Sequence, residues 1–286
     1  DRRYTSSLTV SSAYDAWTED MLLERLWGDH VHLGYYGDPP QNKDFRLAKV
    51  DFVHELVHWS GLDNLPKGSR VLDVGCGIGG TSRILAQDYG FDVVGISISP
   101  GQVKRAQELT PIGLKCKFYV MDALDLNVDD GSFDGVWSVE VGPHILQKQR
   151  YADELLRALR LGGVLALADW NCRDLTNEPM SFLEGLVMQQ LLTQWAHPEF
   201  SSIRDFRQCL LDSPFCKAAV QADDWTISTL PSWMESILEG IRRPWAVLGQ
   251  GPIGLFKALR ETPTILLMHW AFSNRLMQFG VFRSRG

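Results

Sequence analysis

Val71-Leu72-Asp73-Val74-Gly75-Cys76-Gly77-Ile78-Gly79-Gly80 is the stretch that decides the fold. Its first residues predict a buried strand, because Leu72 and Val74 follow a two-residue period. The residues after it predict a helix that carries Ile84 and Leu85 on one face. The glycines between strand and helix let the backbone approach a ligand where a Cβ would collide. Free N–H groups at the helix start face the same place, so the stretch predicts a cofactor cleft at one edge of an α/β sheet.

The chemistry of the cofactor follows from the residues around the glycines. Gly75, Gly77 and Gly80 satisfy G-x-G-x-x-G, the dinucleotide fingerprint. However, Asp73 stands two residues before the first glycine, and its carboxylate suits a cationic ligand such as the amino group of a methionine moiety. Ser97, at the end of the next expected strand, stands where a dinucleotide site requires an acid. The loop therefore favours S-adenosylmethionine over a nicotinamide or flavin cofactor.

Composition places the chain among ordinary soluble enzymes, with 286 residues, 45% hydrophobic and 22% charged. The net charge of −7 argues against a nucleic-acid binder. No apolar run approaches the ~18 to 20 residues of a membrane span. The five cysteines are scattered and form no C-x-x-C pair, which indicates a reducing compartment without a disulfide or zinc framework. Because the chain begins at Asp1, we expect a processed or shortened form, and an upstream anchoring segment stays open.

The C-terminal segment 241–286 differs in charge from the rest of the chain. It contains seven basic residues and one acidic residue, together with many apolar residues. Such a segment is able to lie against an anionic lipid surface. The alternative is a helical cap that packs on the core and turns its basic residues to solvent.

Strand and helix patterns alternate from Arg70 onward. Strands are expected near 70–75, 91–97, 115–121, 133–139 and 163–170, and linking helices near 79–89, 100–109 and 147–160. Helical linkers between successive strands predict a parallel, doubly wound sheet. Outside this region we expect helices near 9–27, 43–59, 174–213 and 231–270, and strands near 218–226 and 276–282.

The fold class that follows is α/β: a Rossmann-like, mostly parallel, doubly wound sheet of seven strands with an inserted helical lid. Helical material after the fifth strand would cover the ligand at the glycine loop and shield it from water. We divide the chain into an N-terminal helical cap region (1–60), a cofactor-binding core (61–173), and the lid with the last two strands (174–286) as parts of one integrated domain.

Longer motifs add a family resemblance over nearly the whole chain. The chain resembles the tocopherol and benzoquinol methyltransferases, most closely those of 2-methyl-6-phytyl-1,4-benzoquinol, which are class I S-adenosylmethionine-dependent methyltransferases. The motifs that carry the resemblance are residues 14–20 (YDAWTED), 27–40 (WGDHVHLGYYGDPP), 71–80, 134–140 (DGVWSVE), 168–171 (ADWN) and 263–268 (PTILLM). The glycine motif is shared with many methyltransferases, whereas 27–40 and the C-terminal motif are much narrower.

The resemblance implies a function and a set of cofactor contacts. The chain would methylate a ring carbon of a prenylated benzoquinol, with a phytyl or solanesyl tail, in tocopherol and plastoquinone biosynthesis. The implied cofactor contacts are Asp73, Gly75, Cys76, Gly77 and Gly79 at the methionine part, Ser97 and Gln102 at the ribose, Asp122 and Ala123 at the adenine, and Ser138 and Val139 at the end of the fourth strand. The acid that most class I enzymes place after the second strand is absent.

Candidate catalytic residues follow from the reaction. A neutral phenol is a poor carbon nucleophile, so a base near neutrality is the natural device, and histidine is the usual one. His144 is the expected base or phenol orienter, with Glu140 and His32 as further catalytic candidates. His30, Tyr36 and Trp170 are expected to contact the substrate.

A pair of histidines and a set of tryptophans can also be interpreted from their spacing and residue type. His54 and His58 stand at i, i+4 without an acidic motif nearby, so we expect a helix-surface pair and no metal site. An apolar tunnel for the prenyl tail is expected along tryptophans of the lid region, namely Trp170, Trp195, Trp225, Trp233 and Trp245.

The sequence also leaves alternative functions open and predicts where in the cell the protein is located. The chain could instead methylate another lipid or an amine, such as γ-tocopherol or a sterol, or bind the cofactor or a prenylquinone without turnover. We expect a peripheral protein on the cytoplasmic side of a membrane, the thylakoid or plasma membrane in a cyanobacterium. Tail preference, ring position and oligomeric state are left open by the sequence.

Overall fold

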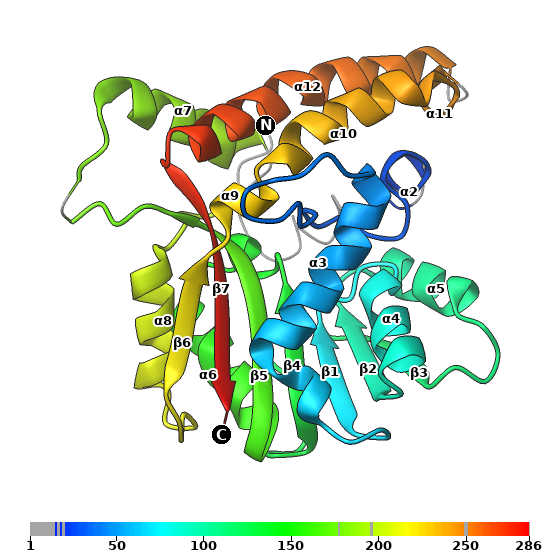
Figure 1. Cartoon of the computed structure of the whole chain (residues 1–286), viewed down its shortest axis with the longest axis vertical. Coiled ribbons are helices and arrows are strands. Elements are labelled where there is room, and N and C mark those ends of the chain that lie inside the picture. Colours follow the sequence, from blue (N-terminus) through cyan, green and yellow to red (C-terminus); the bar gives the residue numbers. More distant parts are fainter. Residues whose placement is uncertain are drawn as a thin grey trace.

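A seven-stranded sheet forms the centre of the computed structural model, which describes residues 15, 18, 21–176, 178–194, 197–248 and 251–285. The strand order is β3-β2-β1-β4-β5-β7-β6 (Figure 1). Strands β1 to β5 pair in parallel, and β7 runs antiparallel to both neighbours. The bounds are β1 Arg70–Val74, β2 Asp92–Ser97, β3 Cys116–Val120, β4 Phe133–Val139, β5 Leu159–Cys172, β6 Val220–Asp224 and β7 Met277–Arg285. The predicted fold class is confirmed.

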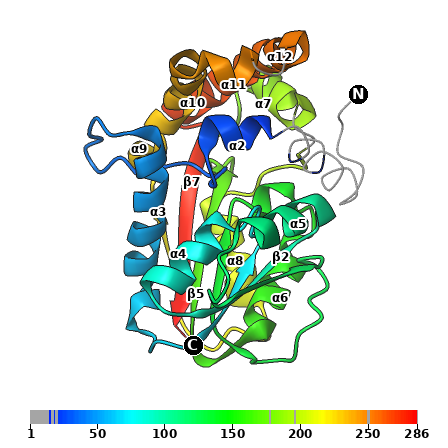
Figure 2. The ribbon, with the colours of Figure 1, turned by 90° about the vertical axis from the view of Figure 1, so that its right-hand side faces the viewer.

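Helices cover both faces of the sheet, as the side view in Figure 2 shows. α3 (Phe45–Ser60) and α4 (Gly80–Asp88) bury their apolar residues on one face, where Val71 lies. α6 (Lys148–Ala158) and α8 (Ile203–Asp212) bury theirs on the other face, where Leu72 lies. Neighbouring residues of β1 therefore serve different cores, as the two-residue period of a strand requires.

Local signals fix the ends of the helices beside the cofactor cleft. Asp44 caps α3, because its carboxylate accepts hydrogen bonds from the backbone N–H groups of Arg46 and Leu47, both at 2.9 Å. Ser99 caps α5 (Pro100–Leu109) by accepting from the Gln102 N–H at 3.0 Å. Of the helix expected near 9–27, the structure describes α2 (Leu22–Trp27), Met21 before it, and two helical residues, Asp15 and Thr18; the others lie outside the described residues.

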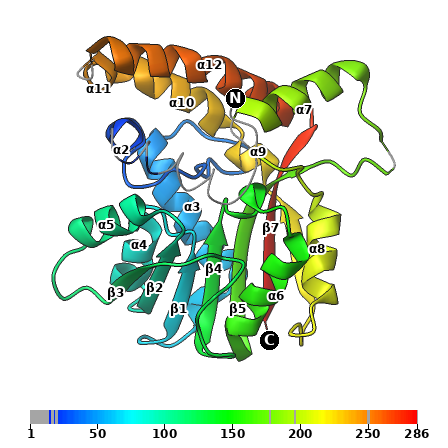
Figure 3. The same ribbon diagram turned by 180° about the vertical axis from the view of Figure 1, so that it is seen from behind.

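A helical lid lies across the carboxyl ends of the strands (Figures 1 and 3). It consists of α7 (Phe182–Gln194), inserted between β5 and β6, and of α9 (Thr226–Thr229), α10 (Pro231–Arg242), α11 (Pro244–Leu248) and α12 (Gly251–Ser273), inserted between β6 and β7. The helix expected over 231–270 is thus three helices. No helix in the described part of the chain is long and apolar enough to cross a membrane.

α8 does not join the lid, although the sequence pattern placed 174–213 there as one helical stretch. Phe206 of α8 packs edge-on against Phe282 of β7, with ring centroids 5.0 Å apart, and stacks near Tyr151 of α6. The apolar stripe of α8 therefore belongs to the sheet face. The division at residues 60 and 173 remains a prediction.

Candidate active site

The glycine loop joins β1 to α4 and forms one wall of a pocket at the carboxyl edge of the sheet. Gly75 and Gly77 have φ angles of 78° and 54°, in the left-handed region that favours glycine. A Cβ at Gly75 would overlap Val141 Cγ2, whereas a Cβ at Gly77 would meet no protein atom within 4 Å. Gly77 therefore faces open space, which leaves room for a ligand against the backbone.

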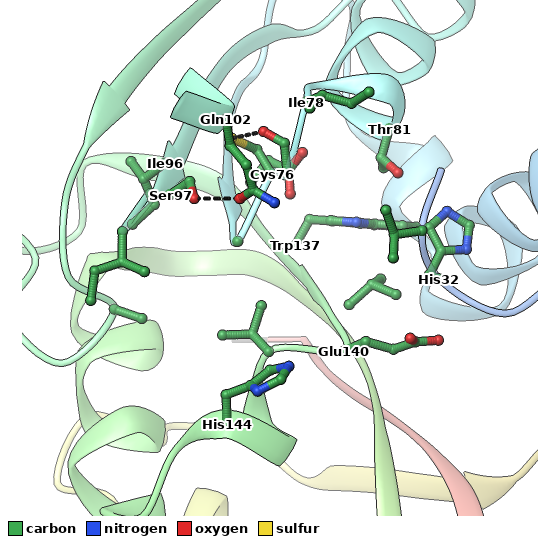
Figure 4. Close-up of a pocket in the computed structure, with 18 of the residues that line it drawn as sticks. His32, Cys76, Ile78, Thr81, Ile96, Ser97, Gln102, Trp137, Glu140 and His144 are labelled. Carbon is green, nitrogen blue, oxygen red and sulfur yellow. Dashed lines mark hydrogen bonds between the residues drawn. The ribbon is translucent and has the colours of Figure 1, made fainter. Parts of the chain in front are cut away.

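The pocket gathers residues from the ends of four strands and from the loop before α3. Its empty space, including the open mouth, is about 1130 Å³, enough for a ligand of cofactor size. The predicted site residues that line it are His30, His32, Asp73, Gly75, Cys76, Gly77, Ser97, Gln102, Asp122, Ala123, Val139, Glu140 and His144. Figure 4 shows ten of the lining residues by name.

Asp73 supplies a buried carboxylate beside the glycine loop. It is only 2% exposed, and its Oδ2 accepts a hydrogen bond from Ser82 Oγ at 2.5 Å. Burial raises the pKa of Asp73 to about 7, and the Ser82 hydrogen bond opposes this shift. A cationic group in the pocket would compensate the buried charge, which fits the ammonium of a methionine moiety.

The adenosine side of the pocket lies beyond β2 and β3. Ser97 Oγ donates to Gln102 Oε1 at 2.8 Å, and both side chains line the pocket (Figure 4). Asp122 also lines the pocket, and its Oδ1 accepts from the Leu124 N–H at 2.9 Å, so it shapes the turn as well.

Two predicted cofactor residues lie away from the pocket surface. Ser138 is buried, its hydroxyl donates to the Val74 carbonyl at 2.9 Å, and it also pairs with the Tyr151 hydroxyl at 2.7 Å. Its side chain therefore points toward α6, and its expected cofactor contact remains a prediction. A Cβ at Gly79 would press on the Phe118 ring, so this glycine serves the packing under the loop.

Glu140, directly after β4, is the central ionisable group of the opposite wall. Its φ of 58° is in the left-handed region, and its Oε1 accepts from the Leu33 N–H at 2.7 Å. The Trp170 indole donates a second hydrogen bond to this carboxylate. Burial raises the pKa of Glu140 to about 8, against the opposing effects of Leu33, Lys49 and Trp170. Glu140 is thus a base of unusual strength for a carboxylate.

The loop before α3 places two histidines over the pocket. His32 Nδ1 donates to the Leu33 carbonyl at 2.8 Å, and its Nε2 lies 3.2 Å from His30 Nδ1, which fits a donor on His30. Burial lowers the pKa of His32 far below its usual range and that of His30 to about 3. Both rings are therefore neutral at physiological pH.

His144 completes the wall from η2 (Gly142–His144), a short turn between β4 and α6. Its ring lies 4.4 Å from the ring of His197, whose Nδ1 donates to the Pro143 carbonyl at 3.1 Å. Burial lowers the pKa of His144 well below its usual range and that of His197 to about 4. Figure 4 places Glu140 between His32 and His144.

Two predicted substrate residues lie outside the pocket wall. Tyr36 is buried under the lid, and its backbone N–H donates to the Ser228 carbonyl at 2.8 Å. Trp170 lies behind Glu140 and packs against the rings of His197 and Trp233, at 5.6 and 5.3 Å. Both therefore lie behind the wall of this pocket, and their expected contact with the substrate remains a prediction.

Of the tryptophans expected along a prenyl tunnel, Trp225 and Trp233 lie in the core, and the tunnel itself remains a prediction. Trp225 packs into the core against Tyr35 and Trp59, at 5.2 and 5.8 Å, and Trp233 packs against Phe272. Trp245 is 66% exposed on α11. Trp195 lies outside the described residues.

Sequence reasoning missed Lys49 of α3. It is 1% exposed, and its Nζ donates to the His30 carbonyl at 2.6 Å, which fixes the histidine loop. Burial lowers the pKa of Lys49 to about 7. The available signal was a lysine among the apolar residues of α3 that face the core at helical spacing, Phe45, Phe52, Val53 and Leu56.

His54 and His58 have separate partners. His54 Nδ1 pairs with the Tyr89 hydroxyl at 2.7 Å, and His58 Nδ1 pairs with Asp63 Oδ2 at 3.0 Å. Within the described ranges, no three His, Cys, Asp or Glu side chains are grouped so as to hold a metal ion.

Comparison with known proteins agrees with this geometry. Residues 72–167 match a family model described as a methyltransferase domain. The chain is 56% identical over 283 residues to a 2-methyl-6-phytyl-1,4-hydroquinone methyltransferase of Synechocystis, covering 99% of this chain and 89% of the relative. It is 30% identical to a chloroplastic tocopherol O-methyltransferase of Arabidopsis thaliana, covering 91% of this chain and 77% of the relative.

A solved structure shows the same fold in complex with the demethylated cofactor. A mycolic acid cyclopropane synthase with bound S-adenosylhomocysteine superimposes with a TM-score of 0.83 at 16% identity, over 100% of both chains. The pocket residues fit the methyl donor, because Gly77 leaves open space and Asp73 offers a buried carboxylate to its ammonium. The chain belongs to the S-adenosylmethionine-dependent methyltransferases, in the family of the 2-methyl-6-phytyl-1,4-hydroquinone and tocopherol methyltransferases.

Proposed function

We propose that this methyltransferase methylates a ring carbon of a prenylated hydroquinone, with a phytyl or solanesyl tail, in tocopherol and plastoquinone biosynthesis. The observation that carries the proposal is the 56% identity over 99% of the chain to a methyltransferase named for 2-methyl-6-phytyl-1,4-hydroquinone. Glu140, His144 and His32 support it, because they present a base and two neutral imidazoles at one end of the cofactor pocket.

The cofactor, when bound, supplies a methyl group on a sulfonium, which needs no activation by the protein. Asp73 and Gly77 would hold its methionine part, Ser97 and Gln102 its ribose, and Asp122 its adenine. The remaining task of the chain is to orient the acceptor ring and manage its protons. Orientation alone contributes up to ~7 to 11 kcal/mol in model reactions.

Glu140 is the base in this proposal. A phenol has a pKa near ~10, and removal of its proton makes the ortho carbon electron-rich. A carboxylate with a pKa of about 8 is far better matched to that proton than histidines whose pKa is strongly lowered. The hydroxyl proton would pass to Glu140, and the ortho ring carbon would then take the methyl group that the cofactor supplies. The ring proton would leave to solvent, which restores aromaticity, and Glu140 would return its proton to the ring oxygen. His144 and His32 orient the hydroxyl groups.

A radiolabelled-methyl assay in detergent tests this function. The acceptors are 2-methyl-6-phytyl-1,4-benzoquinol, its solanesyl analogue, γ-tocopherol, a sterol and a small amine. Label in a ring-dimethylated product of the first two supports the proposal and ranks the tails. Label only in γ-tocopherol, the sterol or the amine would overturn the substrate. Cofactor binding by calorimetry without label in any acceptor would favour a binding protein without turnover.

We also propose that the lid contacts a lipid surface, so that the protein is peripheral to the membrane that dissolves its substrate. The support is a set of exposed apolar side chains on the lid helices, which lie together at one end of the molecule (Figure 1). We call this set the lid face: Phe182, Leu183, Leu186, Ile241, Trp245, Phe256, Leu259 and Leu266. Arg242 and Arg260 stand among them, each paired with a glutamate of the lid, Glu235 and Glu261, so the apolar side chains carry this proposal.

Co-sedimentation with vesicles of phosphatidylglycerol and neutral lipid tests the lid face. Replacement of Trp245, Phe256 and Leu259 by serine should lower the vesicle-bound fraction and the turnover of vesicle-borne substrate, but not of substrate in detergent. The matched control replaces Ile112 and Leu161, which are also exposed but lie outside the lid, by serine. Equal binding of both variants and the wild type would overturn the proposal.

A further inference from the structure

The turn that carries His144 is held at nearly every backbone group. The Gly142 N–H donates to Asp169 Oδ1 at 3.0 Å, and the His144 and Ile145 N–H groups donate within the turn. The Pro143 carbonyl accepts from His197. Such complete hydrogen bonding is more than a surface loop between a strand and a helix requires.

Lys148, the first residue of α6, reaches back to this turn. Its Nζ donates to the Gly142 carbonyl and to the Ile145 carbonyl, the latter at 2.6 Å. One side chain thus fixes the carbonyl groups on both sides of His144. Lys148 is largely buried and lies outside the pocket lining.

Asp169 of β5 holds the same turn from the opposite side. It is 3% exposed, and it accepts from the backbone N–H groups of Gly142 and Val141. A Cβ at Gly142 would overlap Asp169 Oδ2, so the contact also explains why this residue is glycine. Asp169 does not line the pocket either.

We propose that Lys148 and Asp169 are a positioning pair that fixes the His144 imidazole at the acceptor end of the cofactor pocket. The inference rests on the proposed function of His144 in orienting a phenolic hydroxyl. Buried ionisable groups cost free energy of desolvation that an apolar pair of similar volume would avoid. Their hydrogen bonds converge on one turn, and His144 is the polar side chain that this turn presents to the pocket, beside the apolar Val141 and Ile145.

The variants Lys148→Met and Asp169→Asn should lower kcat with the methyl acceptor severalfold and by no more than about tenfold, because they act through one orienting hydrogen bond of His144. The Kd for S-adenosylhomocysteine should stay within about twofold, because neither residue touches the cofactor wall. Lys148→Arg should recover part of kcat, since its donors reach both carbonyls. Glu154→Gln is the matched control: Glu154 also lies on α6 and accepts from the Leu126 N–H at 2.7 Å, but it holds a different loop.

A double-mutant cycle separates positioning from general damage to the fold. In the His144→Ala background, Lys148→Met should lower kcat no further, because its only route to the reaction is then gone. An additional loss of similar size in that background would overturn the proposal.

Amide hydrogen exchange tests the pair without any acceptor, so its result stands even if the proposed substrate is wrong. Lys148→Met and Asp169→Asn should accelerate exchange at Gly142, His144 and Ile145, while Glu154→Gln should leave these amides unchanged. Unchanged exchange in all three variants would overturn the inference. A wild type that methylates none of the acceptors, with accelerated exchange in the variants, would instead refute the proposed function alone.

Discussion

The Leu33 N–H donates to Glu140 Oε1 at 2.7 Å, and this hydrogen bond joins residues that are 107 positions apart. Leu33 belongs to the loop that carries His30 and His32, whereas Glu140 directly follows the fourth strand of the sequence. The bond therefore orients the one strongly perturbed carboxylate of the acceptor wall with the backbone of the loop that covers it. The same hydrogen bond thus ties the histidine loop to the base.

Replacement of Glu140 by glutamine should abolish most of the methyl transfer, because the amide keeps the Leu33 hydrogen bond but cannot take a proton. General-base catalysis is worth about 10² to 10⁴ in rate, and kcat should fall within that range. In the wild type, kcat should rise with pH through about 8, where Glu140 ionises. A variant that retains wild-type kcat, or a flat wild-type profile from pH 6 to 9, would remove Glu140 from proton transfer.

The same substitution should stabilise the protein at high pH. Burial raises the pKa of Glu140 from 4.5 to about 8, so the folded state holds this proton more tightly than the unfolded state. The stability due to Glu140 is fully present below pH 4.5 and is lost as pH rises to about 8. Relative to wild type, Glu140→Gln should gain a few kcal/mol in the free energy of unfolding between pH 5 and 9, measured by urea titration. Glu154→Gln should show no such gain, because Arg157 lowers the pKa of Glu154.

His144→Ala should lower kcat and leave the cofactor Kd nearly unchanged. His144 lies at the acceptor end of the pocket, and its strongly lowered pKa makes it a neutral hydrogen-bonding group. The loss of one orienting hydrogen bond is worth about 0.5 to 1.5 kcal/mol, or about tenfold at most. Turnover assays and calorimetry with S-adenosylhomocysteine check this. Unchanged turnover would exclude His144 from the reaction, and a loss equal to that of Glu140→Gln would make His144 a partner in proton transfer.

Cofactor affinity should depend on the ionisation of Asp73. Because burial raises the pKa of Asp73 to about 7, the carboxylate that attracts an ammonium is mostly protonated at pH 6 and ionised at pH 8. Calorimetry with S-adenosylhomocysteine should therefore give tighter binding at pH 8 and proton release near pH 7. Asp73→Asn should bind about tenfold or more weakly and lose this pH dependence. An equally steep pH dependence in the variant would assign it to another group.

The sequence predicted the cofactor half of the site better than the acceptor half, for a physical reason. Strand, glycine turn and helix are encoded within ten adjacent residues, so Asp73 and Gly77 could be placed from local pattern alone. His197 reaches the site only through packing of a distant segment, and no local pattern predicts that contact. The helical spacing of α3 places Lys49 on the buried face, but not its partner, the His30 carbonyl. The tryptophans show the same limit, because residue type does not distinguish a tunnel wall from the core that Trp225 and Trp233 occupy.

The direction of the Ser138 side chain, in contrast, could have been predicted from the two-residue period of a strand. Successive residues of a strand point to opposite faces, so Trp137 and Val139 share one face and Ser138 the other. Trp137 and Val139 line the pocket, and Ser138 turns to Tyr151. The period of β4, applied residue by residue, places Ser138 correctly.

Gly77→Ala should separate folding from cofactor binding. Its φ of 54° costs an alanine about 1 to 2 kcal/mol, and its Cβ meets no protein atom within 4 Å, so the variant should fold. Because Gly77 lines the pocket, the added Cβ should obstruct the bound ligand. Overpacking of a packed site costs about 1 to 3 kcal/mol, so the affinity for S-adenosylhomocysteine should fall at least tenfold.

Gly75→Ala should instead destabilise the fold more than Gly77→Ala, because its Cβ would overlap Val141 Cγ2 in addition to the strain at a φ of 78°. The obstacle is a side chain, so the double variant Gly75→Ala/Val141→Ala should recover part of the lost free energy of unfolding, whereas Val141→Ala should not rescue Gly77→Ala. Urea unfolding and calorimetry on the four variants decide this. Equal destabilisation of both glycine variants, with no rescue by Val141→Ala, would mean that backbone strain alone explains why the loop contains glycine at these two positions.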